Sequence, residues 1–235
     1  MEILITGGCG FVGGHLAESF VSDGHDVTVL DNLDGFYSCD IKRHNVSVAR
    51  ATAAESDGSY TLIEGDIRDR ATVDSAVADT DIVFHQAAKA GVRRSVEEPH
   101  AVNAVNVTGT LNCLQAAQAA DVDRFVLASS SSVYGKPQYL PYDEEHPTQP
   151  VSPYGVSKPA TQPYARAYHE TYGLSTLSSR YFTLYGPRMR PTSAIPYFGS
   201  RCLPGYTPLI YRPGSPTTPT TYVPDVRAVH QPPLP

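Results

Sequence analysis

The sequence has few cysteines, little positive charge and no long apolar run. Its four cysteines are far apart and form no Cys-x-x-Cys pair, which argues against a disulfide framework and a zinc site. The formal net charge of −6 offers no basic stripe for nucleic acid, and no apolar segment is long enough to span a bilayer. The first expected strand begins at residue 2, so we expect no signal peptide. These absences favour a soluble, cytoplasmic protein without a metal, nucleic-acid or membrane partner.

What the chain does contain is enough apolar material for one sizeable core. Of its 235 residues, 41% are hydrophobic, which suffices for one α/β domain with a small appended lobe. Expected strands at 2–6, 26–30, 60–64, 81–85, 124–128 and 175–181 alternate with expected helices at 11–22, 70–78, 101–120 and 154–172. This alternation predicts a Rossmann-type, doubly wound parallel sheet. Residues 33–57 are polar and irregular, and we expect a loop with a short helix there.

Three glycines, each three residues after the last, follow the first expected strand. In a dinucleotide-binding turn, Gly7 would free the backbone, Gly10 would let it approach a pyrophosphate, and Gly13 would let the helix lie close to the strand. The pyrophosphate would contact the free N–H groups at the start of the helix, around Phe11 and Val12. The stretch therefore predicts a dinucleotide site.

Acidic residues end the next two expected strands. Asp31 lies about 20 residues past the glycines, where a carboxylate binds adenosine ribose hydroxyls and repels a 2′-phosphate, which argues for NAD. Asp66 could accept the adenine amino group, or it could belong to a turn in which Asp69 caps the next helix. His85 is expected to be a hydrogen-bonded structural residue. The cofactor contacts expected beyond the glycine turn are Asp31, Asn32, Asp66, Ile67, Ala87, Ala88 and Asn106.

The residues that predict chemistry are Tyr154 and Lys158. Side chains four apart share one face of a helix, so the ammonium should lie beside the phenol. Because an unperturbed tyrosine has a pKa near 10, it needs a nearby positive charge to act as a base near neutral pH. Lys158 and a cationic nicotinamide ring would supply that charge. The serines at 129–132 would place hydroxyls at the same carboxyl edge of the sheet.

Together these segments resemble the extended short-chain dehydrogenases/reductases, and within them the NAD-dependent epimerase/dehydratase family. The resemblance runs from residue 2 to about residue 211. The chain is most similar to the nucleotide-sugar 4-epimerases, such as the UDP-glucose 4-epimerases. The matching motifs are the Thr-Gly-Gly-x-Gly-Phe-x-Gly opening, Asp31, the Gly65-Asp66 pair, Ser-Ser-Ser-Val-Tyr-Gly at 130–135 and Ser-Pro-Tyr-Gly-x-Ser-Lys at 152–158.

This resemblance implies a tightly held NAD that is reduced and reoxidised in each turnover of a UDP-sugar. Tyr154 would take the proton of the sugar 4-hydroxyl while hydride passes to NAD, and the 4-keto sugar would rotate and regain hydride on its other face. Lys158 would hold the nicotinamide ribose and favour the phenolate. Ser130 would hydrogen-bond the 4-oxygen, with Ser132 as a second candidate. The family also implies a homodimer formed through a bundle of helices.

The choice of sugar stays open at this point. Thr183 and Arg190 resemble residues of the UDP-glucuronate 4-epimerases, in which a hydroxyl and an arginine can meet the sugar carboxylate. The interconversion of UDP-glucose and UDP-galactose is slightly favoured, because Arg-Met-Arg at 188–190 occurs in the hexose branch too. The related dehydratases carry Asp-Glu where Ser131 and Ser132 stand, which argues against dehydration.

Some features depart from the family pattern. Pro159 and Pro163 fall inside the helix expected to carry Tyr154, where we expect them to distort or kink it. Half of the 20 prolines lie in residues 193–235, where no helical or strand period is sustained apart from a short candidate at 208–211. Thr218 replaces an arginine that usually grips the nucleotide diphosphate. We therefore expect an NAD-binding domain at 1–180 and an irregular, apparently truncated substrate lobe at 181–235.

Two other functions remain possible alternatives to a 4-epimerase. A 4-keto sugar reductase would have the same fold but would release its cofactor. An NAD-binding protein without turnover would follow if the prolines, Thr218 and the short lobe abolished catalysis. The sequence leaves the sugar, the nucleotide base and the oligomeric state open.

Overall fold

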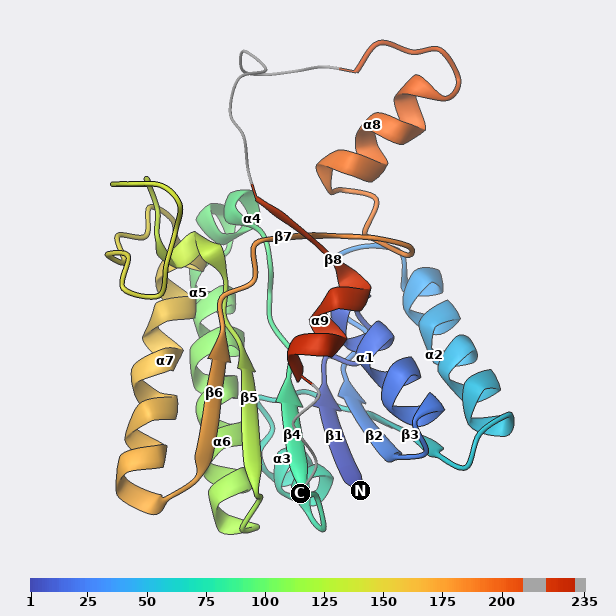
Figure 1. Ribbon diagram of the computed structural model, residues 1–235, viewed down its shortest axis with the longest axis vertical. Helices are drawn as coiled ribbons and strands as arrows, with labels where there is room; N and C mark the ends of the chain where they lie inside the picture. Colours follow the sequence, from blue (N-terminus) through green and yellow to red (C-terminus); the bar gives the residue numbers. More distant parts are fainter. Residues whose placement is uncertain (209–218, 231–235) are drawn as a thin grey trace.

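A single parallel sheet organises the molecule (Figure 1). The computed structural model describes residues 1–208 and 219–230, so Thr218 and most of the expected strand at 208–211 lie outside the described residues. Six strands pair in the order β3-β2-β1-β4-β5-β6, all parallel, as the alternation of strands and helices predicted. They are β1 (Glu2–Thr6), β2 (Asp26–Asp31), β3 (Ser59–Glu64), β4 (Ile82–His85), β5 (Arg124–Ala128) and β6 (Ser175–Ser179).

Helices cover both faces of the sheet, and each face has its own apolar core. Along β1, Leu4 packs into one core while Ile3 and Ile5 pack into the other, because successive strand side chains point to opposite faces. On the first face lie α3 (Arg70–Val77), α6 (Thr110–Ala119) and α7 (Pro153–Tyr172). On the second lie α1 (Phe11–Ser22), α2 (Cys39–Ala54) and α9 (Val223–His230). Both faces of the parallel sheet are thus buried.

The helix α2 is longer than the sequence pattern indicated. It runs over sixteen residues and begins after Ser38, whose hydroxyl accepts a hydrogen bond from the Asp40 N–H. Its buried positions include Lys42 and Asn45 as well as Val46. The expectation of a loop with a short helix was therefore wrong, because polar residues on the buried face hide the apolar period on which it relied.

The helix α7 runs unbroken from Pro153 to Tyr172 with Pro159 and Pro163 inside it, so the expected disruption does not end or divide it. At its start the Ser152 hydroxyl accepts a hydrogen bond from the Gly155 N–H at 2.9 Å. A buried face that includes Lys158 packs inward, and this packing outweighs the cost of about 3 kcal/mol for an interior proline.

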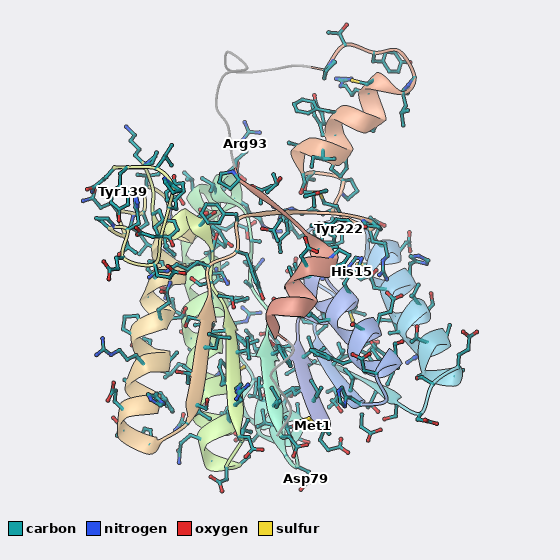
Figure 2. All side chains as sticks on the ribbon, viewed as in Figure 1. Met1, His15, Asp79, Arg93, Tyr139 and Tyr222 are labelled. Carbon is teal, nitrogen blue, oxygen red and sulfur yellow. The ribbon has the colours of Figure 1, made fainter. Side chains whose placement is uncertain are left out.

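The connections at the carboxyl edge are partly helical. After β4 come α4 (Val92–Glu97), α5 (Pro99–Asn103) and a π-helical segment (Ala104–Gly109) that leads into α6. The expected helix at 101–120 therefore exists as one helical run, which starts within α5 and is π-helical over residues 104–109. A 3₁₀ turn (Ser131–Val133) follows β5. Figure 2 shows Met1 and Asp79 at the opposite, amino edge of the sheet. Within the described residues, no helix combines the length and apolarity needed to cross a bilayer.

The C-terminal part contains more regular structure than its proline content suggested. A second sheet pairs β7 (Thr183–Tyr185) with β8 (Thr220–Tyr222) in parallel, and α8 (Ala194–Cys202) projects away from the main sheet (Figure 1). From β8 the chain returns to the main sheet, where α9 packs on α1 and Val226 is 2% exposed. The division into domains at 1–180 and 181–235 remains our proposal.

Candidate active site

A pocket of about 470 Å³ opens at the carboxyl edge of the sheet, where the strand order reverses between β1 and β4. Ligands of open α/β sheets bind at this switch point, because the loops from neighbouring strands diverge there. Every site residue expected from the sequence lines this pocket except Asn106. The structure therefore brings the glycine turn, the acids, the serines and the Tyr154–Lys158 pair to one cavity.

The glycine turn forms a cradle that a side chain would fill. Gly7 has a φ of 70°, and a Cβ there would lie 2.7 Å from the backbone of Ala87. A Cβ on Gly13 would lie 2.5 Å from the Gly7 carbonyl oxygen. The helix α1 starts at Phe11 with no side-chain cap and no acidic residue in its first turn, so its positive end is left for an anion such as a pyrophosphate. These residues fit a dinucleotide.

Asp31 at the end of β2 is held in place from three sides. Its Oδ2 accepts a hydrogen bond from the Cys9 N–H at 3.1 Å, and its Oδ1 accepts one from the Leu33 N–H at 2.8 Å. The ammonium of Lys42 on α2 lies 3.5 Å from Oδ1, and both side chains are less than 10% exposed. No sequence pattern indicated this ion pair, because Lys42 lies in the segment expected to be mainly loop.

Asp66 is fixed as an ionised carboxylate. The Arg68 guanidinium donates to both of its oxygens, at 2.9 and 2.7 Å, and Asn32 donates to Oδ2 at 2.9 Å. These hydrogen bonds, with that from Arg68 foremost, hold the pKa of Asp66 well below its usual range despite partial burial. Asp69 caps α3 by accepting a hydrogen bond from the Ala71 N–H. This matches the alternative prediction, in which Asp66 belongs to a turn and Asp69 caps the helix that follows.

Asn106, which the sequence predicted as a cofactor contact, is not among the residues that line the pocket. It lies in the π-helical segment, 2% exposed. Its Oδ1 accepts from the Lys89 N–H at 2.8 Å, and its Nδ2 donates to the Lys89 carbonyl and to the Ser157 hydroxyl. Asn106 therefore braces the loop after β4 against α7. Its polarity suggested ligand contact, but its hydrogen bonds are made within the protein.

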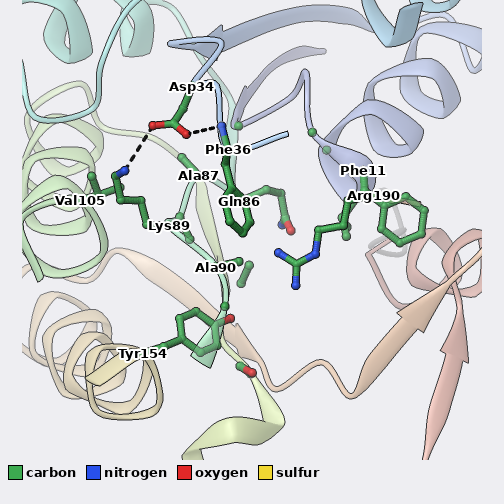
Figure 3. Close-up of a pocket in the computed structure, with 18 of the residues that line it drawn as sticks. Phe11, Asp34, Phe36, Gln86, Ala87, Lys89, Ala90, Val105, Tyr154 and Arg190 are labelled. Atoms are coloured by element: carbon green, nitrogen blue, oxygen red, sulfur yellow. Dashed lines mark hydrogen bonds and ion pairs between the residues drawn. The ribbon is translucent and has the colours of Figure 1, made fainter. Parts of the chain in front are cut away.

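Two further polar residues follow β4. His85 is 1% exposed and hydrogen-bonds Thr6 and Thr110 at 2.8 and 2.9 Å, in the structural role expected of it. Burial lowers its pKa to about 3. Gln86 lines the pocket (Figure 3), where its side chain lies beside the Tyr181 phenol and its hydrogen bond favours the phenolate of that residue.

Tyr154 and Arg190 both line the pocket (Figure 3). Ser130 lines it as well. Burial raises the pKa of Tyr154, whereas a hydrogen bond with the Ser130 hydroxyl and the positive charge of Arg190 lower it. The hydrogen bond and the positive charge both stabilise the phenolate, against the effect of burial. The arginine thus supplies a cation near the phenol, a role that the sequence pattern had assigned to Lys158.

Lys158 is buried on the same face of α7, with 6% of its surface exposed. Its ammonium donates to the Ala128 carbonyl at 2.7 Å, at the end of β5. Burial lowers the pKa of Lys158 to about 8. The lysine is therefore held at the carboxyl edge of the sheet, in the wall of the pocket.

A group of charged residues on the rim was not foreseen from the sequence. Lys89 lies 3.3 Å from Asp34, and Arg94 lies 3.8 Å from the same carboxylate (Figure 3 shows the first contact). Two guanidiniums lie near the ring of Phe36, that of Arg94 at 4.6 Å and that of Arg190 at 5.4 Å from the ring centroid. These partners come from three segments far apart in the sequence, one of which includes α4, so no local pattern marks them.

Substitution of Lys158 by Met is expected to change how stability depends on pH. Below pH 8 the lysine is protonated in both states, and a folded pKa lowered from 10.5 to about 8 corresponds to a cost of about 3 kcal/mol in the folded protein. This cost disappears between pH 8 and 10.5, where the unfolded state binds more protons and wild-type stability rises. We expect Lys158→Met to be more stable than wild type at pH 7, by about 2 kcal/mol after loss of one hydrogen bond.

Urea unfolding of the nucleotide-free proteins at pH 7 and pH 10 measures this difference. The advantage of Lys158→Met should shrink as the pH rises, and a difference that is constant between these values would contradict the prediction. Lys136→Met removes an exposed lysine and controls for the loss of one positive charge.

Comparison with known proteins shows the family to which this chain belongs. Residues 3–231 match the model of the NAD dependent epimerase/dehydratase family. A putative UDP-glucose 4-epimerase of Methanocaldococcus jannaschii is 37% identical over 230 residues, covering 95% of this chain and 70% of that protein. A probable UDP-glucuronate 4-epimerase of Rhizobium meliloti is 33% identical over 241 residues, covering 99% and 69%.

A solved structure supports the same assignment. The crystal structure of UDP-glucuronic acid 4-epimerase from Bacillus cereus, in complex with UDP-glucuronic acid and NAD, superposes with a TM-score of 0.88 at 30% identity, covering 98% of this chain and 73% of that one. Because the family model matches nearly the whole chain, and because the pocket lies where the fold binds dinucleotides, this protein belongs to the NAD dependent epimerase/dehydratase family.

Proposed function

We propose that the protein is an NAD-dependent 4-epimerase of a UDP-sugar, with Tyr154 as its acid–base residue. The observation that carries the proposal is the position of the Tyr154 phenol. It lines the same cavity as the Ser130 hydroxyl, the Arg190 guanidinium and the glycine turn. A proton-transferring group therefore lies at the cofactor site, as transient oxidation of a hydroxyl requires.

The residues proposed to hold NAD lie along the carboxyl edge. The N–H groups at the start of α1 would bind the pyrophosphate, Asp31 and Asn32 the adenosine ribose, Asp66 the adenine, and Lys158 the nicotinamide ribose. When bound, NAD supplies the acceptor and then the donor of hydride at sugar C4.

Tyr154 and Ser130 are proposed to handle the proton and the 4-oxygen. The 4-hydroxyl proton passes to the Tyr154 oxygen as the C4–H bond breaks and its electron pair leaves as hydride, which yields a 4-keto sugar. Return of hydride to the opposite face, with the proton returned by Tyr154, inverts C4. Arg190 and Ser130 favour the phenolate that begins the cycle. The hydroxyls of Ser131 and Ser132, where related dehydratases carry two acids, support epimerisation over water elimination.

The surroundings of Arg190 favour a sugar acid over the neutral hexose that the sequence slightly favoured. Within the described residues Arg190 makes no ion pair, and its Nε donates to the Ser193 hydroxyl at 3.1 Å. In glucuronate the carboxylate is attached to C5, next to the reacting C4. A guanidinium close to the Tyr154 phenol is therefore placed to bind it, with Thr183 as a hydroxyl partner.

Substitution of Tyr154 by Phe tests the reaction. We expect kcat for interconversion of UDP-glucuronate and UDP-galacturonate to fall about 10²- to 10⁴-fold, the usual contribution of a positioned acid–base group. NAD retained after purification, measured by mass spectrometry, should be unchanged. Wild-type protein that interconverts no UDP-hexose or UDP-uronate would exclude the epimerase, and NAD lost in each turnover would instead indicate a reductase.

Substitution of Arg190 by Met tests the sugar. We expect KM for UDP-glucuronate to rise about 10- to 100-fold through loss of a charge-assisted contact, while KM for UDP-glucose changes little. Steady-state kinetics with both substrates measures the ratio. Equal effects on the two sugars would contradict recognition of a carboxylate and would return the choice to UDP-glucose.

We further propose a cytoplasmic homodimer formed through α4 and α7. These helices pack together, and apolar side chains on them are exposed: Val96 is 65% exposed and Tyr164 42% exposed. Sedimentation velocity should show a dimer for the wild type and a monomer for Val96→Asp. Leu203→Asp alters an exposed leucine at the end of α8 and should leave the dimer intact. A monomeric wild type would refute the proposal.

A further inference from the structure

Arg188 carries structural features that the proposed reaction does not use. Its φ of 61° lies in the left-handed region, which a residue with a Cβ occupies only where surrounding contacts hold it. Its side chain is 16% exposed and forms an ion pair with Glu18 on α1 at 2.5 Å. The same guanidinium donates to Oδ1 of Asn45 on α2 at 3.3 Å. These two contacts join the C-terminal part of the chain to the first two helices.

Asn45 continues this connection to the glycine turn. It is 2% exposed, and its Nδ2 donates to the carbonyls of Cys9 and Gly10 at 3.0 and 3.2 Å. Its amide therefore has both a donor side directed to the turn and an acceptor side directed to Arg188. Because the amide can satisfy these partners in only one orientation, the two contacts depend on each other.

Arg190 lies two residues beyond Arg188 and lines the pocket. The backbone between them is compact, since the Met189 N–H donates to the Gly186 carbonyl and the Ser193 N–H donates to the Arg190 carbonyl. The path is fixed at its start as well, because a Cβ on Gly186 would lie 2.6 Å from Val223. A shift of the Arg188 backbone would therefore move Arg190.

We propose that Arg188 is a positioning residue, which anchors the segment 186–193 to the glycine turn through Glu18 and Asn45 and so places Arg190 over Tyr154. The inference rests on the proposed function only where it takes Arg190 to contact the substrate. The anchor itself is a property of the fold, and it ties the loop that binds the sugar to the turn that binds the cofactor.

A double-mutant cycle tests whether Arg188 acts through Arg190. Isothermal titration of UDP-glucuronate into NAD-loaded protein gives Kd for wild type, Arg188→Ala, Arg190→Ala and the double variant. We expect each single substitution to raise Kd, by about 10-fold for Arg188→Ala and up to about 100-fold for Arg190→Ala. The double variant should match Arg190→Ala, because a positioning residue has no effect once its target is absent. Multiplied effects would overturn the proposal.

Matched variants separate positioning from general stability. Arg166→Ala removes an exposed arginine that pairs with Glu170 on α7, and should leave Kd unchanged. Arg188→Lys keeps a charge for Glu18 but cannot also hold Asn45 in a fork, so we expect a partial rise in Kd. If Arg188→Ala does not fold, the cycle is run with Arg188→Lys.

Amide hydrogen exchange tests the anchor without any sugar. In NAD-free protein, Arg188→Ala or Arg188→Lys should exchange faster than wild type both in segment 189–193 and in the glycine turn, because one connection holds both. Faster exchange in only one of them, or in neither, would overturn the anchor. If wild type binds no UDP-sugar, the proposed function fails, and this exchange measurement still decides the role of Arg188.

Discussion

The close approach of two backbones at the centre of the sheet is the constraint on which the site depends. The turn after β1 and the loop after β4 nearly touch, and a Cβ on Gly7 would collide with Ala87. Since these loops come from the strands at which the order reverses, their contact defines the floor of the pocket. The acids after β2 and β3 and the serines after β5 then line its two sides.

Burial of ionisable groups gives the pocket its chemical character. Desolvation lowers the pKa of Lys158 and raises that of Tyr154, so both groups are destabilised in their charged forms. The protein offsets this effect at the phenol with Ser130 and Arg190. The arginine comes from the C-terminal part, and so the base of the proposed reaction depends on a residue outside the sheet.

The C-terminal part is therefore held to the nucleotide-binding part by polar contacts as well as by apolar packing. Val226 of α9 is buried in one of the two main cores, and Arg188 contacts both α1 and α2. By contrast, α8 has no buried residue. The chain spans about 70% of the length of the relatives described above. Substrate binding is thus proposed from the segments around Thr183 and Arg190, both of which line the pocket.

The sequence alone determined the features that are local in the chain. The alternation of strands and helices indicated the parallel sheet, and the glycine spacing and the Tyr154–Lys158 spacing placed residues on one turn or one helix face. Tertiary structure decided the rest. Polar residues on the buried face concealed the length of α2, and the hydrogen bonds of Asn106 turned it away from the pocket. Arg188 and Glu18 are 170 residues apart, and contacts at such a distance follow no periodic pattern, because they arise only when the sheet brings the elements together.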